Sequence, residues 1–427
     1  MAKRHLIGIG GVGMSALAAA LVKLGDEVTG ADRTLGTPNV RFLESLGIRV
    51  FPDDGSGIDA ATDEVIVSTA IEETNPGLKK AKNLGIPVTH RAKALARTLK
   101  DYKLVAVVGT CGKSTVTAML GHVLAECGLD PMCVNGANVP GWEGAVRFGK
   151  GQYAVAEVDE SDKSLVAFSP YAAIVTNASA DHYSKEEMDE VFDAFVKDCE
   201  GPVVDGRNVG IWEYESEKLG KCENGEVTKW VTPLPGRHNL QNAALAAKMA
   251  LALGCQPDDV KRALSTFRGV ERRLQLIIQS VPRSPFPVPF SVYDDYAHNP
   301  EKLKAMWTTL AEKHPQGICV IWRPHGYAPL RKMLDALAAM FAETIRPQDK
   351  LLLLPVYDAG GTTDRSINAD ALKARVKGEG ERRIELVSDL DAAFEWCKAH
   401  KDDYAAFVTC GARDPGLPVL AKRLSEM

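Results

Sequence analysis

The stretch LVAVVGTCGKSTVTAMLGHVL, residues 104–124, joins a run of branched apolar residues to a glycine-bracketed turn and then to a helical pattern. The apolar run predicts a buried strand, and the spacing of apolar residues after Lys113 predicts a helix. Backbone N–H groups in such a loop, together with the positive end of the helix dipole, favour phosphate. The stretch therefore predicts an α/β fold with a phosphate cradle, although Val107 stands where the generic motif has its first glycine.

The residues of this cradle have separate expected roles. Lys113 is expected to reach the β- and γ-phosphates of ATP, and Ser114 is expected to bind Mg²⁺. A tight strand–helix turn without a ligand is the alternative, which the Gly-Lys-Ser sequence disfavours. The loop residues expected to contact the nucleotide are Gly109, Thr110, Cys111, Gly112, Lys113, Ser114 and Thr115.

A second glycine loop, GIGGVG, lies near the N-terminus, after a strand pattern and before a helix pattern. Its glycines would let the backbone approach a diphosphate at a helix N-terminus. Asp32 ends the next strand, near the spacing of about 20 residues that dinucleotide-binding folds show. Taken alone, the loop indicates a dinucleotide, or a turn that binds nothing. The residues concerned are Gly8, Gly10, Gly11, Gly13 and Asp32.

Length and periodicity divide the chain into domains. At roughly 100–200 residues per domain, 427 residues predict two to four domains. The strand–helix alternation restarts near Asp101, and its texture changes again from about Gly269. We predict an α/β protein with a Rossmann-like domain at 1–99, a central P-loop ATPase-like parallel sheet at 100–268 and a Rossmann-like domain at 269–427. Two phosphate loops in separate domains argue against a simple dehydrogenase.

Composition excludes several classes of protein. The chain is 45% hydrophobic and 25% charged, with a formal net charge of −5, which is typical of soluble globular protein and gives no nucleic-acid footprint. A stretch of about 18 apolar residues, which a membrane span needs, does not occur. Nine cysteines, an odd number without a C-x-x-C pair, favour a reducing compartment over a disulfide framework or a zinc site. We therefore expect a cytoplasmic protein without a membrane or nucleic-acid partner.

Polar residues cluster where the later strands are expected to end, the edge at which open parallel sheets bind ligands. The acidic EVDESD segment and the TNASADH segment would supply oxygen and imidazole ligands for Mg²⁺, unless the first is only a solvated acidic loop. An arginine at the junction of the last two domains could stabilise charge on a transferring phosphoryl group, unless it is a surface residue. The candidates are Glu160, His182, His238, Asn239, Asn242, Arg272, Arg273, Asp294, Asp295, Tyr296 and His298.

As a set, these residues resemble the Mur ligase family along the whole chain. Any one motif is weak, but the whole set in register is strong. The motifs that carry the resemblance are HLIGIGGVGMSALA, VSTAIEETNP, HRAKALA, GTCGKST, EVDESDKS, IVTNASADH, PGRHNLQNAA, RRLQ, VYDDYAHNP, RPHGY, LLLLPVYDAG and TCGARD. The resemblance implies a UDP-binding domain, an ATPase domain and an acceptor domain. The ligand of the first loop is then the UDP diphosphate, and the short G-T-x-G-K-[ST] cradle explains Val107.

The chemistry that the resemblance implies is amide synthesis with ATP and Mg²⁺. ATP phosphorylates a UDP-muramoyl carboxylate, and an amino group displaces phosphate from the acyl phosphate. The implied metal ligands are Ser114, Glu160 and His182. The implied catalytic residues are Lys113, Glu160, His182, Arg273, Asp294, Asp295 and His298. The implied nucleotide- and substrate-binding residues are those of the two glycine loops with Asp32, Ser68, Thr69, His238, Asn239, Asn242, Arg272, Tyr296, His325 and Arg331.

The chain departs from the family's amino-acid-adding pattern at four positions. Cys111 replaces a histidine, Ser179 replaces a glutamate, and Gly326 and Pro329 replace arginines. An arginine fork is a natural clamp for an amino acid carboxylate, so the acceptor is the open question. UDP-N-acetylmuramate with L-alanine is the leading pair.

Several alternatives to this pair remain open. The recycling ligase that attaches a murein peptide, or a paralogue with another acceptor, comes next. An NAD-dependent dehydrogenase and a non-catalytic binding protein are further alternatives. We expect a monomer or weak homodimer that binds a UDP-N-acetylmuramate-type nucleotide sugar and an amino acid or short peptide.

Overall fold

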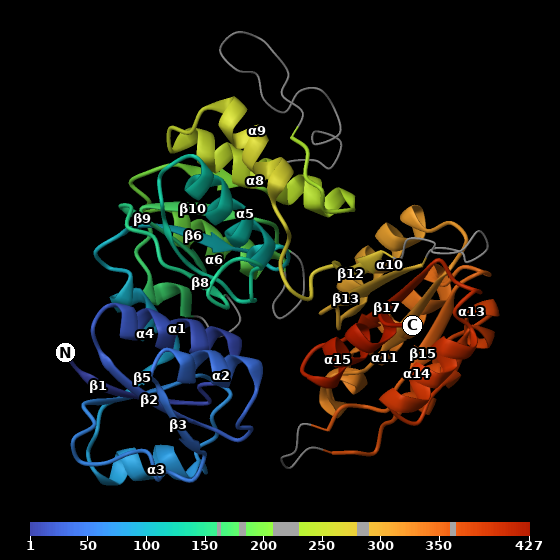
Figure 1. Cartoon of the computed structure of the whole chain (residues 1–427), viewed down its shortest axis with the longest axis horizontal. Helices are drawn as coiled ribbons and strands as arrows, with labels where there is room; N and C mark the ends of the chain where they lie inside the picture. The colour runs from blue at the N-terminus through green and yellow to red at the C-terminus, as the bar shows by residue number, and fades with distance from the viewer. Residues whose placement is uncertain (160–163, 179–184, 208–229, 280–289, 359–363) are drawn as a thin grey trace. The chain divides into compact units, whose positions relative to one another are not determined.

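The structure is a computed structural model that describes residues 1–159, 164–178, 185–207, 230–279, 290–358 and 364–427. These residues form three β-sheets, each dominated by parallel pairs and packed with helices (Figure 1). The predicted α/β class is therefore confirmed.

The N-terminal sheet is parallel throughout, with the strand order β3-β2-β1-β4-β5. Its strands are β1 (Lys3–Ile7), β2 (Glu27–Asp32), β3 (Arg49–Pro52), β4 (Glu64–Val67) and β5 (Val88–His90). Its helices are α1 (Val12–Lys23), α2 (Pro38–Ser45), α3 (Pro76–Asn83) and α4 (Arg91–Thr98). The chain order reverses between β1 and β4, and such a point opens a crevice at the carboxyl ends of the strands.

The central sheet has the order β11-β10-β6-β9-β7-β8, with β8 antiparallel to β7. Its strands are β6 (Lys103–Val108), β7 (Met132–Val134), β8 (Val146–Arg147), β9 (Tyr153–Glu157), β10 (Ala172–Val175) and β11 (Val203–Asp205). The helical segments that follow are α5 (Lys113–Glu126), the 3-10 turn η1 (Ser164–Ala167), α6 (Lys185–Val196), α8 (Arg237–Ala252) and α9 (Pro257–Thr266). Strand β6 is buried from Leu104 to Val108, as its run of branched apolar residues predicts.

The C-terminal sheet has the order β12-β13-β17-β14-β15-β16, with β12 antiparallel at one edge. Its strands are β12 (Gln275–Gln279), β13 (Ser291–Asp295), β14 (Ile318–Trp322), β15 (Lys350–Leu353), β16 (Ile384–Leu386) and β17 (Ala406–Cys410). Its helices are α10 (Pro300–Lys313), α11 (Tyr327–Thr344), α12 (Ala369–Arg375), α13 (Glu379–Arg382), α14 (Leu390–Ala399) and α15 (Gly416–Leu424).

Helices cover both faces of this C-terminal sheet, so its central strands are apolar on both sides. Val320 belongs to the core cluster that contains Trp307 of α10 and Phe341 of α11. The next residue, Ile321, belongs to the cluster that contains Leu417 of α15. This alternation is the period of two that a strand imposes on its side chains.

Three helices begin with the same local device, an Asn or Thr cap followed by proline. Thr37, Asn75 and Asn299 accept hydrogen bonds from backbone N–H groups three residues on, at 3.2, 3.0 and 2.9 Å. The cap satisfies one of the unpaired N–H groups of the first turn, and proline at the first helical position lacks an N–H that would need a partner. These caps fix the residues at which α2, α3 and α10 begin.

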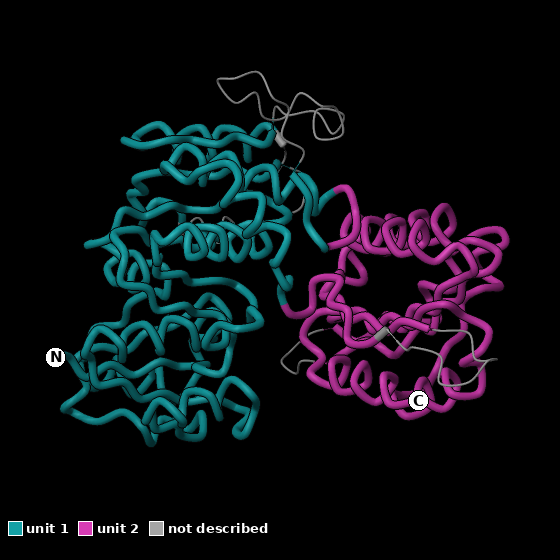
Figure 2. Tube along the Cα trace, turned by 45° about the horizontal axis from the view of Figure 1, so that its top comes forward, with its two compact units in different colours: residues 1–233, 238–270 teal, residues 234–237, 271–427 magenta. Residues whose placement is uncertain are grey.

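Contacts group the chain into two compact units, shown in teal and magenta in Figure 2. One unit is 1–233 with 238–270, and the other is 234–237 with 271–427. The N-terminal and central sheets fall into one unit because a single hydrophobic cluster joins residues such as Leu17 of α1 to Leu104 of β6. The division into domains at 1–99, 100–268 and 269–427 stays a prediction.

No helix in the described part of the chain has both the length and the apolar character needed to cross a membrane.

Candidate active site

The phosphate cradle of residues 109–115 lies between the end of β6 and the first turn of α5. Gly109 and Gly112 adopt positive φ angles of 126° and 87°. A Cβ atom on Gly109 would overlap the hydroxyl of Thr176, so this position needs glycine for space as well as for conformation. The cradle is thereby pressed against the carboxyl end of β10.

Hydrogen bonds from the next strand hold the shape of the cradle. The backbone N–H of Cys111 donates to Oδ1 of Asn177 at 2.9 Å. The carbonyl oxygen of Cys111 accepts from Thr176 Oγ1 at 2.7 Å and from Asn177 Nδ2 at 2.9 Å. The position where the family pattern has histidine is therefore tied through its backbone, and the loop is preorganised by the chain itself.

Lys113 lies over its own loop. Its Nζ atom donates to the carbonyl oxygen of Gly109 at 2.6 Å. Ser114 and Thr115, in the first turn of the 14-residue helix α5, are buried. A lysine, a helix N-terminus and a glycine-shaped loop form a donor set that fits a nucleotide phosphate.

Of the three predicted metal ligands, Ser114 lies in the described part of the chain. Glu160 and His182 lie outside the described residues, as does Ser179. Ser114 supplies a hydroxyl oxygen of the kind that Mg²⁺ accepts. In the described ranges, no group of three or more His, Cys, Asp or Glu side chains is arranged to hold a metal ion. The ligand set Ser114, Glu160 and His182 stays a prediction.

Helix α8 brings the predicted amide side chains against the cradle. An ideal Cβ on Gly112 would lie 2.7 Å from Oδ1 of Asn242, so this side chain rests on the loop. Nδ2 of Asn242 donates to Oδ1 of Asn239 at 3.3 Å, and both residues are buried. Burial lowers the pKa of His238 at the start of this helix, which favours the neutral ring.

The N-terminal glycine loop is shaped by Asp32. Oδ2 of Asp32 accepts from the backbone N–H of Gly10 at 2.8 Å, and Oδ1 accepts from that of Thr34 at 2.9 Å. Asn39 donates to the carbonyl oxygen of Gly10 at 2.9 Å. Both carboxylate oxygens of Asp32 therefore hold the chain's own backbone, while contact with a nucleotide stays a prediction.

The other N-terminal candidates meet at the same sheet edge. Ser68 and Thr69 follow β4, the strand beside β1, and Gly8, Gly11 and Gly13 follow β1 itself. The sequence reasoning missed Arg91 at the start of α4. Its Nη1 lies 2.8 Å from where a Cβ on Gly13 would be, which puts a cation beside the glycine loop. The signal was present, since Arg91 belongs to the HRAKALA motif.

In the C-terminal unit, the predicted residues gather where β13, β17 and β14 end. The guanidinium carbons of Arg272 and Arg273 lie 5.1 and 5.3 Å from the ring centroid of Tyr296. The rings of His298 and His325 stand 4.8 Å apart, edge to face. Residues that follow two parallel strands of one sheet, β13 and β14, thus form one polar cluster at the edge where both strands end.

Asp294 and Asp295 are buried beneath this cluster and bond to the protein itself. Asp294 accepts from Arg272 Nε at 3.0 Å and from Thr409 Oγ1 at 2.7 Å. Asp295 accepts from the backbone N–H groups of Leu274 at 2.6 Å and Ala297 at 2.7 Å. Burial raises the pKa of Asp294 to about 6 and also raises the pKa of Asp295.

Arg272 is equally engaged by the fold. Besides Asp294, its Nη2 donates to the carbonyl oxygen of Gly411 at 2.6 Å. The structure therefore gives Arg272, Asp294 and Asp295 a scaffolding role, and the predicted nucleotide contact of Arg272 and the catalytic roles of the two aspartates stay predictions.

His298 is held as a neutral ring with a defined tautomer. Burial lowers its pKa to about 4, and the nearby Lys302 adds to the effect. Nδ1 lies 2.9 Å from the carbonyl oxygen of Tyr296. A carbonyl can only accept, so Nδ1 carries the proton and Nε2 keeps its lone pair. A ring in this state can accept a proton at Nε2.

Comparison with known proteins bears on this arrangement. Residues 3–103 match the family described as Mur ligase family, catalytic domain, and residues 272–413 match Mur ligase, glutamate ligase domain. A UDP-N-acetylmuramate–L-alanine ligase of Rhizobium etli is 30% identical over 99% of this chain and 97% of its own length. The chain belongs to the Mur ligase family. The ligase prediction is confirmed, and the dehydrogenase alternative is set aside.

Further relatives agree with this assignment. The UDP-N-acetylmuramate–L-alanine ligase of Xanthomonas axonopodis pv. citri is 32% identical, over 96% of this chain and 93% of its own. The crystal structure of the UDP-N-acetylmuramate–alanine ligase of Thermotoga maritima matches with a TM-score of 0.78 and 26% identity, covering 100% and 99% of the two chains. A murein peptide ligase of Psychrobacter arcticus matches with a TM-score of 0.70, covering 100% and 99%, but at 20% identity this likeness concerns the fold alone.

In this Mur ligase, Arg331 ties a helix to a loop. Its Nη2 lies 2.8 Å from a carboxylate oxygen of Asp364 and 3.1 Å from Oγ of Ser366. These contacts connect α11 to the segment before α12. The predicted substrate contact of Arg331 stays a prediction, and it would require this arginine to exchange partners.

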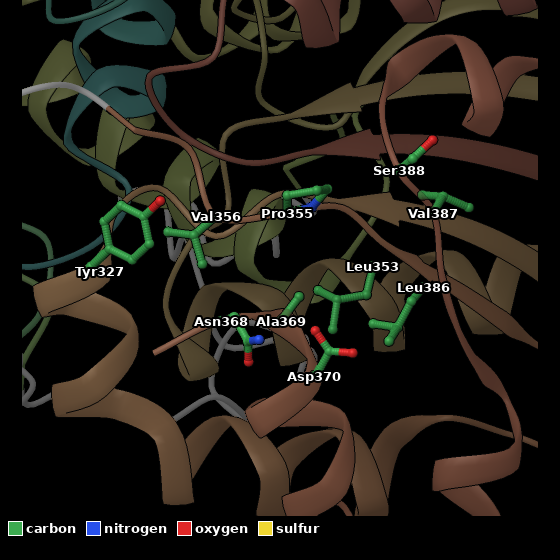
Figure 3. A pocket seen from close by; sticks show the side chains of 10 residues that line it. All are labelled: Tyr327, Leu353, Pro355, Val356, Asn368, Ala369, Asp370, Leu386, Val387 and Ser388. Carbon is green, nitrogen blue, oxygen red and sulfur yellow. The ribbon is translucent and has the colours of Figure 1, made fainter. Parts of the chain in front are cut away.

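A shallow cavity of about 290 Å³ lies where β15 and β16 end. Figure 3 shows Tyr327 of α11 at one end of it and Leu386 at the other. Its lining consists of Tyr327, Leu353, Pro355, Val356, Asn368, Ala369, Asp370, Leu386, Val387 and Ser388. None of the predicted catalytic residues lines it, so this cavity is separate from the cluster around Tyr296.

Proposed function

We propose that this Mur ligase joins the carboxylate of UDP-N-acetylmuramate to the amino group of L-alanine, with conversion of ATP to ADP and phosphate. The observation that carries the proposal is the near full-length likeness to proteins with that name in Rhizobium etli and Xanthomonas axonopodis, at 30% and 32% identity. The glycine loops and the cluster around Tyr296 supply the groups that such a reaction needs.

The cradle would bind the triphosphate of ATP. Its backbone N–H groups and the N-terminus of α5 favour anionic oxygens, and Lys113 would leave the carbonyl of Gly109 to neutralise charge on the transferring phosphoryl group. Ser114, Glu160 and His182 would hold Mg²⁺, which supplies further neutralisation of phosphate charge. Asn239 and Asn242 would support the nucleotide side of the cradle.

The N-terminal loop would bind the diphosphate of the UDP substrate. Gly8, Gly10, Gly11 and Gly13 allow close backbone approach, and Arg91 adds a charge that a diphosphate attracts. Ser68 and Thr69 would contribute hydroxyl groups from the neighbouring strand end. Asp32 would contribute indirectly, because its carboxylate accepts the hydrogen bond of the Gly10 N–H and so holds the loop in shape.

The acceptor amine must lose a proton before or during attack on the acyl phosphate. His298 would accept this proton at Nε2 during the attack, because its ring is neutral and Nδ1 already carries a proton. Its pKa of about 4 makes it a weak base, so it would take the proton only as the C–N bond forms and the attacking nitrogen becomes acidic. His325, whose ring contacts that of His298, would complete this surface. The attack forms the C–N bond and expels phosphate, which carries away the bonding electron pair.

A murein peptide acceptor is the second candidate. The specific observation is that Gly326 and Pro329 stand where the amino-acid-adding pattern has arginines. Their small side chains would leave room beside His325 for an acceptor larger than one amino acid.

Phosphate release tests the proposal directly. Purified protein is incubated with ATP, Mg²⁺ and UDP-N-acetylmuramate, and with L-alanine, glycine, L-serine or a murein tripeptide in turn. Release with L-alanine and little with the tripeptide is expected. Release only with the tripeptide would replace the first candidate by the second, and a protein that binds ATP but turns over none of these acceptors would contradict both.

We also propose that the protein acts in the cytoplasm, where ATP is present, as a monomer or weak homodimer. Light scattering across a range of protein concentrations would distinguish these two states.

A further inference from the structure

Arg413 follows the central strand β17 and has an unusual backbone. Its φ angle is +67°, a conformation that non-glycine residues avoid. The N–H of Asp414 donates to the carbonyl oxygen of Ala412 at 2.9 Å, across Arg413. This pairing with a positive central φ is that of the rare, strained γ-turn. A strained residue at the edge where ligands bind calls for a functional reason.

The turn at Arg413 is held rigidly on both sides. Oδ2 of Asp414 accepts from Arg323 Nη1 at 2.6 Å, and Oδ1 accepts from the N–H of Gly416 at 2.8 Å. The N–H of Gly411 donates to the carbonyl oxygen of Asp295 at 3.1 Å. The side chain of Arg413 is nevertheless exposed. The fold therefore fixes the backbone of this residue and leaves its guanidinium in solvent.

This turn lies beside the acceptor cluster, which consists of Tyr296, His298 and His325. Strand β17 lies between β13 and β14 in the sheet. The segment after β13 carries Tyr296 and His298, and the segment after β14 carries His325. Parallel strands end at one edge, so the turn at Arg413 lies between these two segments.

Four other arginines near this edge already have partners. Arg272 is paired with Asp294, Arg323 with Asp414, and Arg331 with Asp364. Arg365 is paired with Asp358. Within the described ranges, the structure records no ion pair or hydrogen bond of the Arg413 side chain. Its guanidinium is thus available to an anion without the loss of an existing pair.

We propose that Arg413 binds the α-carboxylate of the amino acid acceptor and so determines acceptor specificity. The inference rests on the proposed function, and it supplies the carboxylate clamp that Gly326 and Pro329 do not provide. A guanidinium can bind a carboxylate through two parallel hydrogen bonds, which also orients the amine of a small amino acid. Arg413 thus acts as a binding residue, while His298 remains the base.

The test compares L-alanine with L-alaninamide, which has the same amine and no carboxylate. The variant is Arg413→Gly, because glycine accepts the positive φ and removes only the side chain. We expect the wild type to have a KM at least about tenfold higher for L-alaninamide, since loss of a charge-assisted bond costs at least about one factor of ten. In R413G, the KM for L-alanine should rise by a similar factor, and the preference over L-alaninamide should disappear.

Controls separate this role from a structural one. In R413G, the KM values for ATP and UDP-N-acetylmuramate and the midpoint of thermal unfolding should stay near those of the wild type. Arg413→Lys should recover part of the preference, since it keeps the charge without the fork. Arg382→Gly, at an exposed arginine of α13, should leave the KM for L-alanine unchanged.

Each outcome decides a different point. An unchanged KM for L-alanine in R413G, or equal use of the two acceptors by the wild type, would overturn the role of Arg413 and leave the proposed function standing. If the wild type uses another acceptor from the panel, that acceptor and its carboxamide replace the alanine pair. A wild-type protein that turns over none of the panel would overturn the proposed function, and the inference with it.

Discussion

Asp294 and Arg272 form a mostly buried ion pair beneath the cluster around Tyr296, with Arg272 Nε 3.0 Å from Asp294 Oδ2. The carboxylate is 1% exposed, and its second oxygen accepts from Thr409. Arg272 itself has a positive φ of 59° and accepts, through its carbonyl oxygen, the N–H of Tyr296 at 2.8 Å. Arg272 therefore connects the segment before β12 to both Asp294 and Tyr296 at the end of β13.

Removal of this carboxylate should destabilise the C-terminal unit strongly. Asp294→Ala leaves Arg272 without its partner in a mostly buried site, and such a loss costs about 3–5 kcal/mol. Asp294→Asn should cost less, because it can keep an acceptor for Thr409. Urea denaturation measures both values. Asp391→Ala is the control, since its pair with Arg423 is exposed and should contribute no more than about 1 kcal/mol. If both alanine variants lost a similar free energy of unfolding, the buried pair would contribute no more to stability than the exposed one.

Lys113→Ala should remove catalysis without unfolding the protein. Loss of one preorganised charge at a developing transition state costs about 100-fold or more in kcat. Lys113 is only partly buried, at the start of α5, so thermal stability should change little. Phosphate release and calorimetric unfolding are measured side by side. Amide formation at the wild-type rate in this variant would remove Lys113 from the mechanism.

A methyl group at Gly109 should damage the cradle more than the same change at another glycine with positive φ. Gly109→Ala places a Cβ against Thr176, whereas Gly254, with φ of 95°, has nothing within 4 Å of its Cβ position. Gly254→Ala should therefore cost only the backbone strain of about 1–2 kcal/mol. Gly109→Ala should also lose ATP binding, measured by calorimetry. Equal ATP affinity in the two variants would mean that the cradle tolerates the clash.

Arg91→Ala should weaken binding of the UDP substrate selectively. A charge-assisted hydrogen bond contributes about 1.5–3 kcal/mol, so the KM for UDP-N-acetylmuramate should rise by about 10- to 100-fold. The KM for ATP should stay the same. Lys93→Ala, two residues along the same helix and exposed, is the matched control. A rise in the KM for ATP instead would show that Arg91 serves the other phosphate loop.

Acidification should destabilise the C-terminal unit through His314. Burial lowers its pKa from 6.5 to about 4, with contributions from Lys313 and Arg346. The unfolded chain therefore binds the proton first, and the free energy of unfolding falls as the pH drops from about 6.5 to about 4, by up to about 3 kcal/mol.

His314→Gln should reduce this pH dependence and can keep a partner for the hydroxyl of Tyr293, which lies 3.1 Å from Nε2. The free energies of unfolding of both proteins are compared at pH 7 and pH 4.5. His298 of the same unit, whose pKa is also lowered to about 4, adds to this slope, and Asp294, whose pKa is raised to about 6, opposes it. An identical slope in the variant would exclude His314 as a contributor.

Much of the fold could be predicted from local patterns. The strand predicted to end at Asp32 forms β2 (Glu27–Asp32), and the apolar run before the cradle forms β6. Both signals depend on periodicity and on glycine, which act over a few residues. Short strands such as β7, β8 and β16 were not predicted, because two or three residues carry too little pattern and depend on their neighbours in the sheet.

The candidate site was harder to predict, since side-chain partners depend on distant segments. The sequence marks Asp294 and Asp295 as polar residues at a strand end, but not that they bind Arg272 and the backbone of Leu274. Those contacts depend on positive φ angles at Arg272 and Leu274. Neither arginine nor leucine is a residue type that predicts a positive φ. Arg91 was missed although it belongs to the HRAKALA motif, because the motif does not show that Arg91 lies beside Gly13, 78 positions earlier.

The hydrophobic cluster shared by the N-terminal and central sheets affects how Mur ligases could be recombined. Leu17 and Leu104 contribute to one core, so a chimaera joined near residue 99 would need two foreign surfaces to match. Exchange of residues 271–427 avoids that core, although the segment 234–237 packs with the C-terminal unit and would have to be exchanged too. For an engineer, and for recombination in evolution, the C-terminal unit is therefore the interchangeable part, and the two glycine loops are inherited together.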